Sequence, residues 1–94
     1  MKPPPYLMRL LQTALEGRGW GVEVYGPIGD RVEVTLEHVD GPLLTAGWRL
    51  VDPWEPASSW RYTGGTIRPH PIAREVQIGV RDLLREVRRI GGES

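Results

Sequence analysis

Hydrophobic and polar positions recur with two different periods along this chain, and each period predicts one kind of element. In residues 6–16 and again in residues 72–90, apolar side chains return every three or four positions, which is the spacing of an amphipathic helix. The first stripe contains Leu7, Leu10, Leu11, Ala14 and Leu15, and the second contains Ile72, Val76, Val80, Leu83, Val87 and Ile90. We therefore expect one helix near each end of the chain.

Between the two expected helices, apolar residues alternate with polar residues, which predicts half-buried strands. The alternation covers residues 20–25, 31–37 and 44–51, and residues 60–62 suggest a short fourth strand. Turns rich in Gly and Pro separate these segments. We predict an α+β fold with an N-terminal helix, a three- to four-stranded antiparallel sheet and a C-terminal helix. Both helices should lie on one face of the sheet, because that arrangement buries both stripes against one apolar sheet face.

The chain has 94 residues, which is enough for one domain spanning residues 1–94. We expect residues 1–5 to form a Pro-rich lead-in and residues 91–94 a flexible tail. The sequence contains no cysteine, so thiol chemistry and disulfides are excluded and a reducing, cytoplasmic location is favoured. No apolar run is long enough for a membrane helix, and no apolar segment after the N-terminal prolines indicates a signal peptide.

Charge is unevenly distributed although the formal net charge is zero. Residues 20–59 carry seven acidic residues and two arginines, whereas residues 60–90 carry seven arginines and three acidic residues. Such an asymmetry indicates a charged partner surface unless the fold pairs the charges internally.

The polar side of the expected C-terminal helix separates into an acidic and a basic lane. Arg74, Arg81, Arg85 and Arg88 fall in the basic lane, and Ile78 lies among them as an apolar residue opposite the buried stripe. Like charges four residues apart disfavour an isolated helix slightly, so a partner would relieve the repulsion. We predict that these five residues bind a partner; the alternative is an ordinary solvated helix face.

The strand parity places a second charged surface on the far side of the sheet. Glu23, Glu33 and Glu37 point away from the expected core, so this outer face should be acidic. Arg31 and Arg49 share that parity and can act as cross-strand partners. Glu33 and Glu37 are predicted to contact a partner.

Aromatic residues divide between core and loop positions. Trp20 and Trp48 share the inward parity of their strands, which predicts a core position for both. Trp54 lies in a loop bounded by prolines, where an exposed indole could fill a pocket of a partner.

No residue pattern supports catalysis. His38 lies at a strand end and is expected to be a rim or cap residue, and His70 lies between two prolines before the last expected helix. Neither has a sequence neighbour that would orient it as a catalytic base, and no metal-ligand spacing or phosphate-binding glycine loop is present. We predict no enzyme activity, no metal, no cofactor and no small-molecule substrate.

These features favour a protein-interaction or self-assembly module that binds another protein or copies of itself. Two unlike surfaces on opposite sides suit a head-to-tail contact that closes a ring or extends as a filament. The order of elements resembles that of small ring subunits of viral tails and head completion. An inhibitor or antitoxin-like protein would use the same surfaces.

Nucleic-acid binding through the basic lane is the alternative from a different class. The expected order also resembles that of double-stranded RNA-binding domains, but the lysine cluster of their second helix is absent here, and residues 26–30 carry no base. The remaining support is local, because arginines on one helix can hold phosphates.

Overall fold

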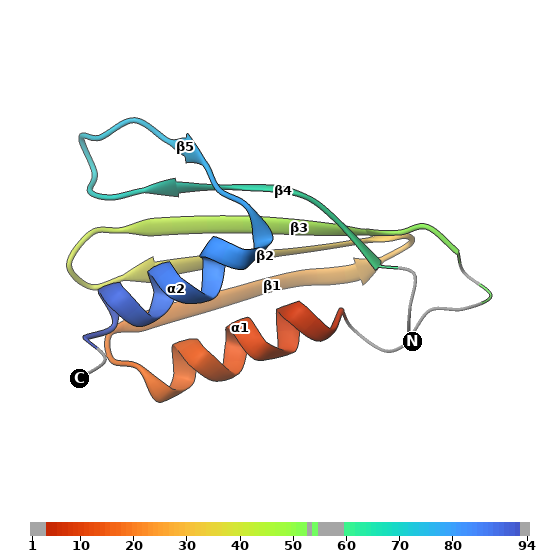
Figure 1. Ribbon diagram of the computed structural model, residues 1–94, viewed down its shortest axis with the longest axis horizontal. Coiled ribbons are helices and arrows are strands. Elements are labelled where there is room, and N and C mark those ends of the chain that lie inside the picture. Colours follow the sequence, from red (N-terminus) through yellow and green to blue (C-terminus); the bar gives the residue numbers. More distant parts are fainter. Residues whose placement is uncertain (1–3, 53, 55–59, 93–94) are drawn as a thin grey trace.

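The computed structural model describes residues 4–52, 54 and 60–92, which form two helices and five strands (Figure 1). The elements are α1 (Pro5–Glu16), β1 (Trp20–Ile28), β2 (Arg31–His38), β3 (Leu43–Leu50), β4 (Trp60–Arg68), β5 (Val76–Gln77) and α2 (Val80–Ile90). The predicted α+β class is confirmed. Residues 1–3 of the expected lead-in and 93–94 of the expected tail lie outside the described residues.

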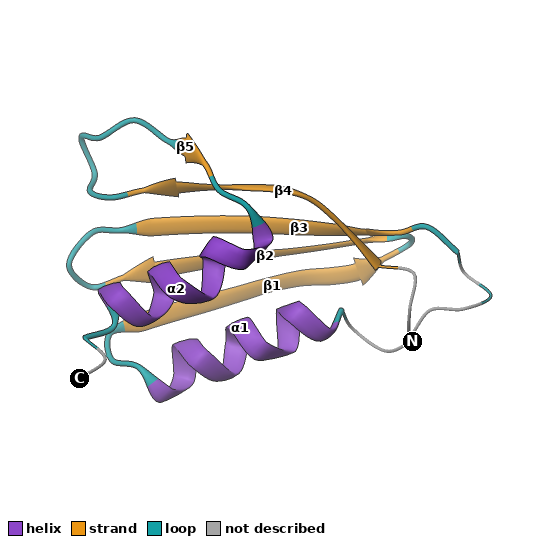
Figure 2. Ribbon diagram, in the orientation of Figure 1, coloured by secondary structure: helices purple, strands orange, loops and turns teal. Residues whose placement is uncertain are grey.

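The sheet has five antiparallel strands in the order β1-β2-β3-β4-β5, so each strand pairs with its neighbour in sequence (Figure 2). The prediction of three to four strands was therefore too low. β4 has nine residues, whereas the sequence pattern suggested only residues 60–62. The pattern missed the rest of the strand because the alternation changes phase at Thr63, where a β-bulge interrupts the pairing with β3. Tyr62 and Gly65 consequently face the same side although they are three residues apart, which breaks the simple period of two.

The C-terminal helix begins at Val80, eight residues later than predicted. Residues 76–77 instead pair with β4 as β5, and the backbone N–H of Ile78 donates to the carbonyl of Gly65 at 3.0 Å. Val76 and Val80 satisfy the helical spacing, whereas the strand alternation also includes Ile78, which lies between them. β-Branched residues favour the extended form, and Gly79 inside a helix would cost about 1 kcal/mol.

Both helices pack on the same face of the sheet, called the inner face here, and against each other (Figure 1). The buried core contains Leu7, Leu10 and Ala14 from α1, Leu83 and Val87 from α2, and Val32, Val34, Leu36, Leu44, Ala46 and Trp48 from the sheet. This core confirms the predicted burial of two helical stripes against one sheet face.

Three predicted core residues lie at the surface instead. Leu15 is 80% exposed because it lies one position beyond Ala14, about 100° further around α1. Ile72 and Val76 are exposed because neither belongs to a helix. The exposed surface of α1 is therefore more apolar than the sequence pattern indicated.

Candidate interaction surfaces

The basic surface of α2 consists of Arg81, Arg85, Arg88 and Arg89, which surround the half-buried Leu84 in a shallow depression of about 490 Å³. Two of the four arginines have acidic partners on the same helix. Arg85 Nη2 lies 3.1 Å from Asp82, and Arg89 Nη2 lies 2.6 Å from Glu86, which raises the pKa of Arg89. Among the described residues, no acidic side chain forms an ion pair with Arg81 or Arg88. These two cations are therefore available to an external anion.

Arg74 and Ile78 do not belong to this basic surface, so their predicted place in the helical lane was wrong. Arg74 lies in the exposed loop between β4 and β5. Ile78 is half-buried against the core, and its carbonyl accepts a 2.8 Å hydrogen bond from the Tyr62 hydroxyl. Burial of the ring raises the pKa of Tyr62. Ile78 thus attaches β5 to β4 and cannot be the apolar centre of an exposed patch.

The outer face of the sheet carries its acids on β1 and β2 and most of its arginines on β3 and β4, with one arginine, on β2, among the acids. Glu23, Glu33 and Glu37 are all exposed on β1 and β2, as predicted. Arg49 on β3 and Arg61 on β4 lie on the opposite half of the same face. The outer face thus carries the predicted acids and, as expected from strand parity, arginines as well.

The arginines of the outer face pair with a turn residue rather than with the strand glutamates. Arg31, Arg49 and Arg61 lie directly opposite one another across β2, β3 and β4. Asp30 accepts a 2.9 Å hydrogen bond from Arg49 Nε and lies 3.9 Å from Arg31 Nε. The Arg49 guanidinium lowers the pKa of Asp30. Within the described residues, Arg61 has no acidic partner.

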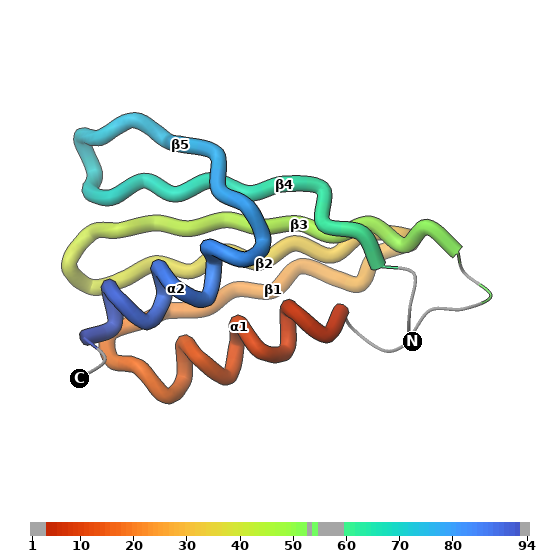
Figure 3. The backbone as a smooth tube through the Cα atoms, in the orientation of Figure 1, coloured from red at the N-terminus to blue at the C-terminus, as the bar shows by residue number. Residues whose placement is uncertain are grey.

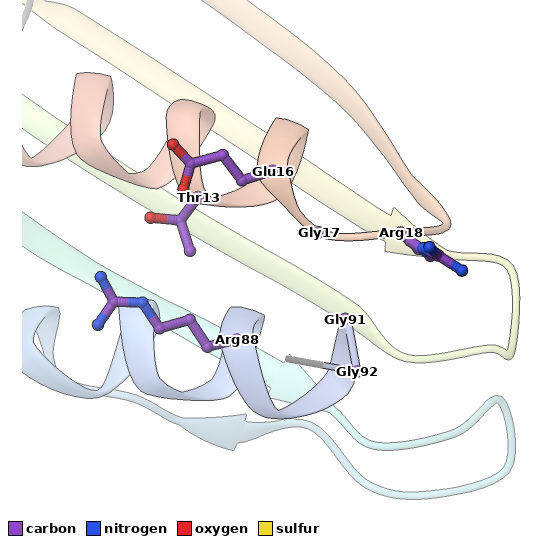
Figure 4. Close-up of a pocket in the computed structure, with 7 residues that line it drawn as sticks. All are labelled: Thr13, Glu16, Gly17, Arg18, Arg88, Gly91 and Gly92. Atoms are coloured by element: carbon purple, nitrogen blue, oxygen red, sulfur yellow. The ribbon is translucent and has the colours of Figure 1, made fainter. Parts of the chain in front are cut away.

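A polar groove of about 550 Å³ separates the C-terminal ends of the two helices (Figure 4). Thr13 and Glu16 of α1 and Arg88 of α2 lie along the gap, whereas the side chain of Arg18 points away from it (Figure 4). The two helix ends lie close together at Gly91, where a Cβ atom would lie 3.5 Å from Gly17 Cα. The groove is open to solvent, and its lining combines a carboxylate, a hydroxyl and arginines.

The two histidines lie in different settings, with His38 buried and His70 exposed. His38 is 6% exposed, and its Nε2 atom lies 2.7 Å from the carbonyl of Arg18 while Nδ1 accepts the backbone N–H of Asp40 at 3.2 Å. Its ring also packs edge-on against Trp20. His38 therefore ties the end of β2 to the loop before β1, which is the predicted cap role. His70 is exposed in the β4–β5 loop, not before a helix.

The part of the chain that the structure describes contains no cluster of three potential metal-binding side chains. It also contains no helix that is both long and apolar enough to cross a membrane. Trp54 is 90% exposed, and its backbone N–H donates to Asp52 Oδ1 at 2.9 Å. Its predicted role in partner contact stays a prediction.

The surface that the sequence patterns did not reveal lies along β1 and α1. Every residue of β1 after Trp20 is exposed, although Val22 and Val24 face the same side as the buried Leu36 and Val34. β1 is an edge strand, so only one of its two sides pairs with another strand. α1 runs alongside β1 (Figure 1), and Leu15 of α1 is also exposed. A sequence pattern shows which residues face inward but not which strand lies at the edge of the sheet.

No protein-family model, curated protein or solved structure matches this chain.

Proposed function

We propose that this chain is a non-catalytic protein-interaction module that assembles with copies of itself into a small ring or filament, as subunits of viral tails and head-completion rings do. The observation that carries the proposal is the edge strand β1, which has nine residues and is exposed along almost its whole length. Natural edge strands are usually short, charged toward the core or covered, because an open edge pairs readily with another chain.

The side chains beside this edge support the same function. Met8 and Leu15 of α1 and Val22, Val24 and Ile28 of β1 are all large apolar residues that are at least about one-third exposed. Together with Tyr25 of β1, they make up six of the eleven large hydrophobic residues with this exposure in the described part of the chain. Large apolar side chains exposed on neighbouring elements are candidates for a protein–protein contact.

Light scattering coupled to size-exclusion chromatography tests the proposal. The wild-type protein is expected to exceed monomer mass and to grow with concentration across a hundredfold range. Val24→Lys should give a monomer, because a charged side chain beside the edge blocks strand pairing. Ile72→Lys makes a similar change on the exposed β4–β5 loop and should assemble like the wild type. A wild-type protein that stays monomeric at low and high salt contradicts the proposal.

A second candidate function, nucleic-acid binding, is supported by the two unpaired arginines of the α2 surface. Arg81 and Arg88 flank the depression beside Leu84, and phosphate oxygens are natural partners for such guanidinium groups. Binding of an oligonucleotide should then weaken steeply with salt and disappear in a protein carrying Arg81→Glu and Arg88→Glu. An unchanged oligonucleotide shift in that variant contradicts nucleic-acid binding through α2.

A further inference from the structure

The sheet has a second partly open edge, at β4. β5 pairs with β4 only at Thr66 and Ile67, and the chain then leaves the sheet after Ile78 to enter α2 (Figure 3). Within the described residues, no strand pairs with residues 61–63 along the edge of β4 that faces away from β3. An open hollow lined by Thr63 and Gly79 adjoins this segment. The fold therefore presents one long free edge at β1 and one short free edge at β4.

The two edges carry opposite charges on the outer face. Glu23 lies on β1, and its carboxylate accepts a 2.5 Å hydrogen bond from Tyr25, whose pKa is raised as a result. Arg61 lies on β4 directly opposite Arg49, which is already paired with Asp30. Like charges directly opposite each other are unfavourable, so an additional carboxylate beside Arg61 would be stabilising.

Resting on the self-assembly function proposed above, we propose that β1 of one copy pairs with the free segment of β4 in the next copy and continues the sheet from subunit to subunit. An antiparallel pairing that places Glu23 opposite Arg61 also places Val22 opposite Tyr62 and Gly21 opposite Thr63. In this register the inner-face residues of both strands share one side, because Val22 and Tyr62 both face the helices. Aromatic residues opposite β-branched residues are a favourable cross-strand pair.

The charges argue against the symmetric alternative, in which β1 pairs with β1 of a second copy. A two-fold axis would bring the acidic halves of two outer faces together, including both copies of Glu23 and Glu33. The β1–β4 contact instead joins an acidic half to a basic half. A contact between two different surfaces of identical subunits leaves one surface of each kind free for a further subunit. Such a contact therefore produces rings or filaments rather than dimers.

Cysteine crosslinking tests this contact cleanly, because the chain has no cysteine of its own. Directly opposite residues in an antiparallel pair have Cα atoms about 4.5–5.5 Å apart, which suits a disulfide. Within one chain, β1 and β4 are separated by two strands, or about 14 Å, so a disulfide between positions 23 and 61 must join two copies. The double variant with Glu23→Cys and Arg61→Cys should form a ladder of covalent oligomers under mild oxidation.

Two controls belong with the crosslink. Glu37→Cys combined with Arg61→Cys should form no ladder, because Glu37 lies on β2, inside the sheet. Charge reversal gives an independent measurement: Arg61→Glu alone should weaken assembly about tenfold, and adding Glu23→Arg should restore it.

The outcomes separate this contact from the broader function. If the double variant forms oligomers in solution but no covalent ladder, the β1–β4 contact is overturned and self-assembly is left standing. Covalent dimers from Glu23→Cys alone identify the symmetric β1–β1 pairing and overturn the proposal in the same way. A protein that neither crosslinks nor exceeds monomer mass overturns both the contact and the function.

Discussion

Two leucines of α1 provide a direct test of how this helix packs, because both belong to the same apolar stripe in the sequence. Leu10 is 1% exposed and Leu15 is 80% exposed. Replacing each by alanine removes the same atoms from the same helix, so the two variants differ only in their surroundings. We expect Leu10→Ala to destabilise the fold strongly and Leu15→Ala to have little effect.

The expected magnitude follows from the buried surface. Burial of one methylene contributes about 0.8 kcal/mol, so truncation at Leu10 removes about 2.4 kcal/mol of transfer free energy. The cavity left between α1, α2 and the sheet raises the loss to about 3–4 kcal/mol. At Leu15 about one-fifth of the side chain is buried, which gives a loss of about 0.5 kcal/mol. The better helix propensity of alanine offsets a few tenths of that loss.

Urea unfolding followed by tryptophan fluorescence measures the difference, at a concentration where light scattering shows a monomer. With a slope of about 1–1.5 kcal/mol per molar urea, Leu10→Ala should lower the midpoint by about 2–4 M. Leu15→Ala should leave the midpoint within about 0.5 M of the wild type. Free energies of unfolding that differ by less than about 1 kcal/mol between the two variants would refute the described packing of α1.

Three further substitutions test other parts of the fold. Gly65→Ala should lower the thermal midpoint, since the added Cβ would collide with a β3 backbone carbonyl. Gly79→Ala serves as the control, because a Cβ at that position meets only a side-chain oxygen of Asp82 at 4.0 Å. Equal thermal midpoints for the two variants would count against the β3–β4 register. Asp30→Asn should remove stability that is present above the ordinary carboxyl pKa of 3.8 and lost as pH falls through the lowered value. The wild-type advantage in thermal midpoint should therefore shrink as pH falls below 3.8 and vanish in stronger acid, and an advantage that persists once Asp30 is protonated excludes the Arg49 pair as its source. Tyr62→Phe leaves the half-buried carbonyl of Ile78 without its hydrogen bond and should lower the free energy of unfolding in urea by about 1 kcal/mol. An unchanged free energy of unfolding would contradict this hydrogen bond.

Periodicity predicted α1, β2 and β3 well because each of these elements buries one face along its whole length. β2 shows the clearest case, with Val32, Val34 and Leu36 buried and their neighbours exposed or half-buried. The same method failed at residues 72–79, where one set of apolar residues fits both a helix and a strand. Pairing with β4, a contact distant in sequence, decided between them.

The candidate surfaces show the same division. The acids of β1 and β2 and the arginines of α2 were identified from strand and helix parity. The alignment of Arg31, Arg49 and Arg61 depends on register across three strands, which parity alone does not give. The partner of Arg49 is Asp30, a turn residue whose position relative to β3 is set by that register.

The sequence by itself determined the fold class, the inner and outer faces of the central strands, the absence of thiol chemistry and the uneven distribution of charge. These properties depend on each residue and its near neighbours, so a local pattern contains them. The tertiary structure decided the start of α2, the exposure of Leu15 and the position of β1 and β4 at the open edges of the sheet. Those properties depend on which segments lie side by side, and a strand has the same alternation at the edge of a sheet as in its centre.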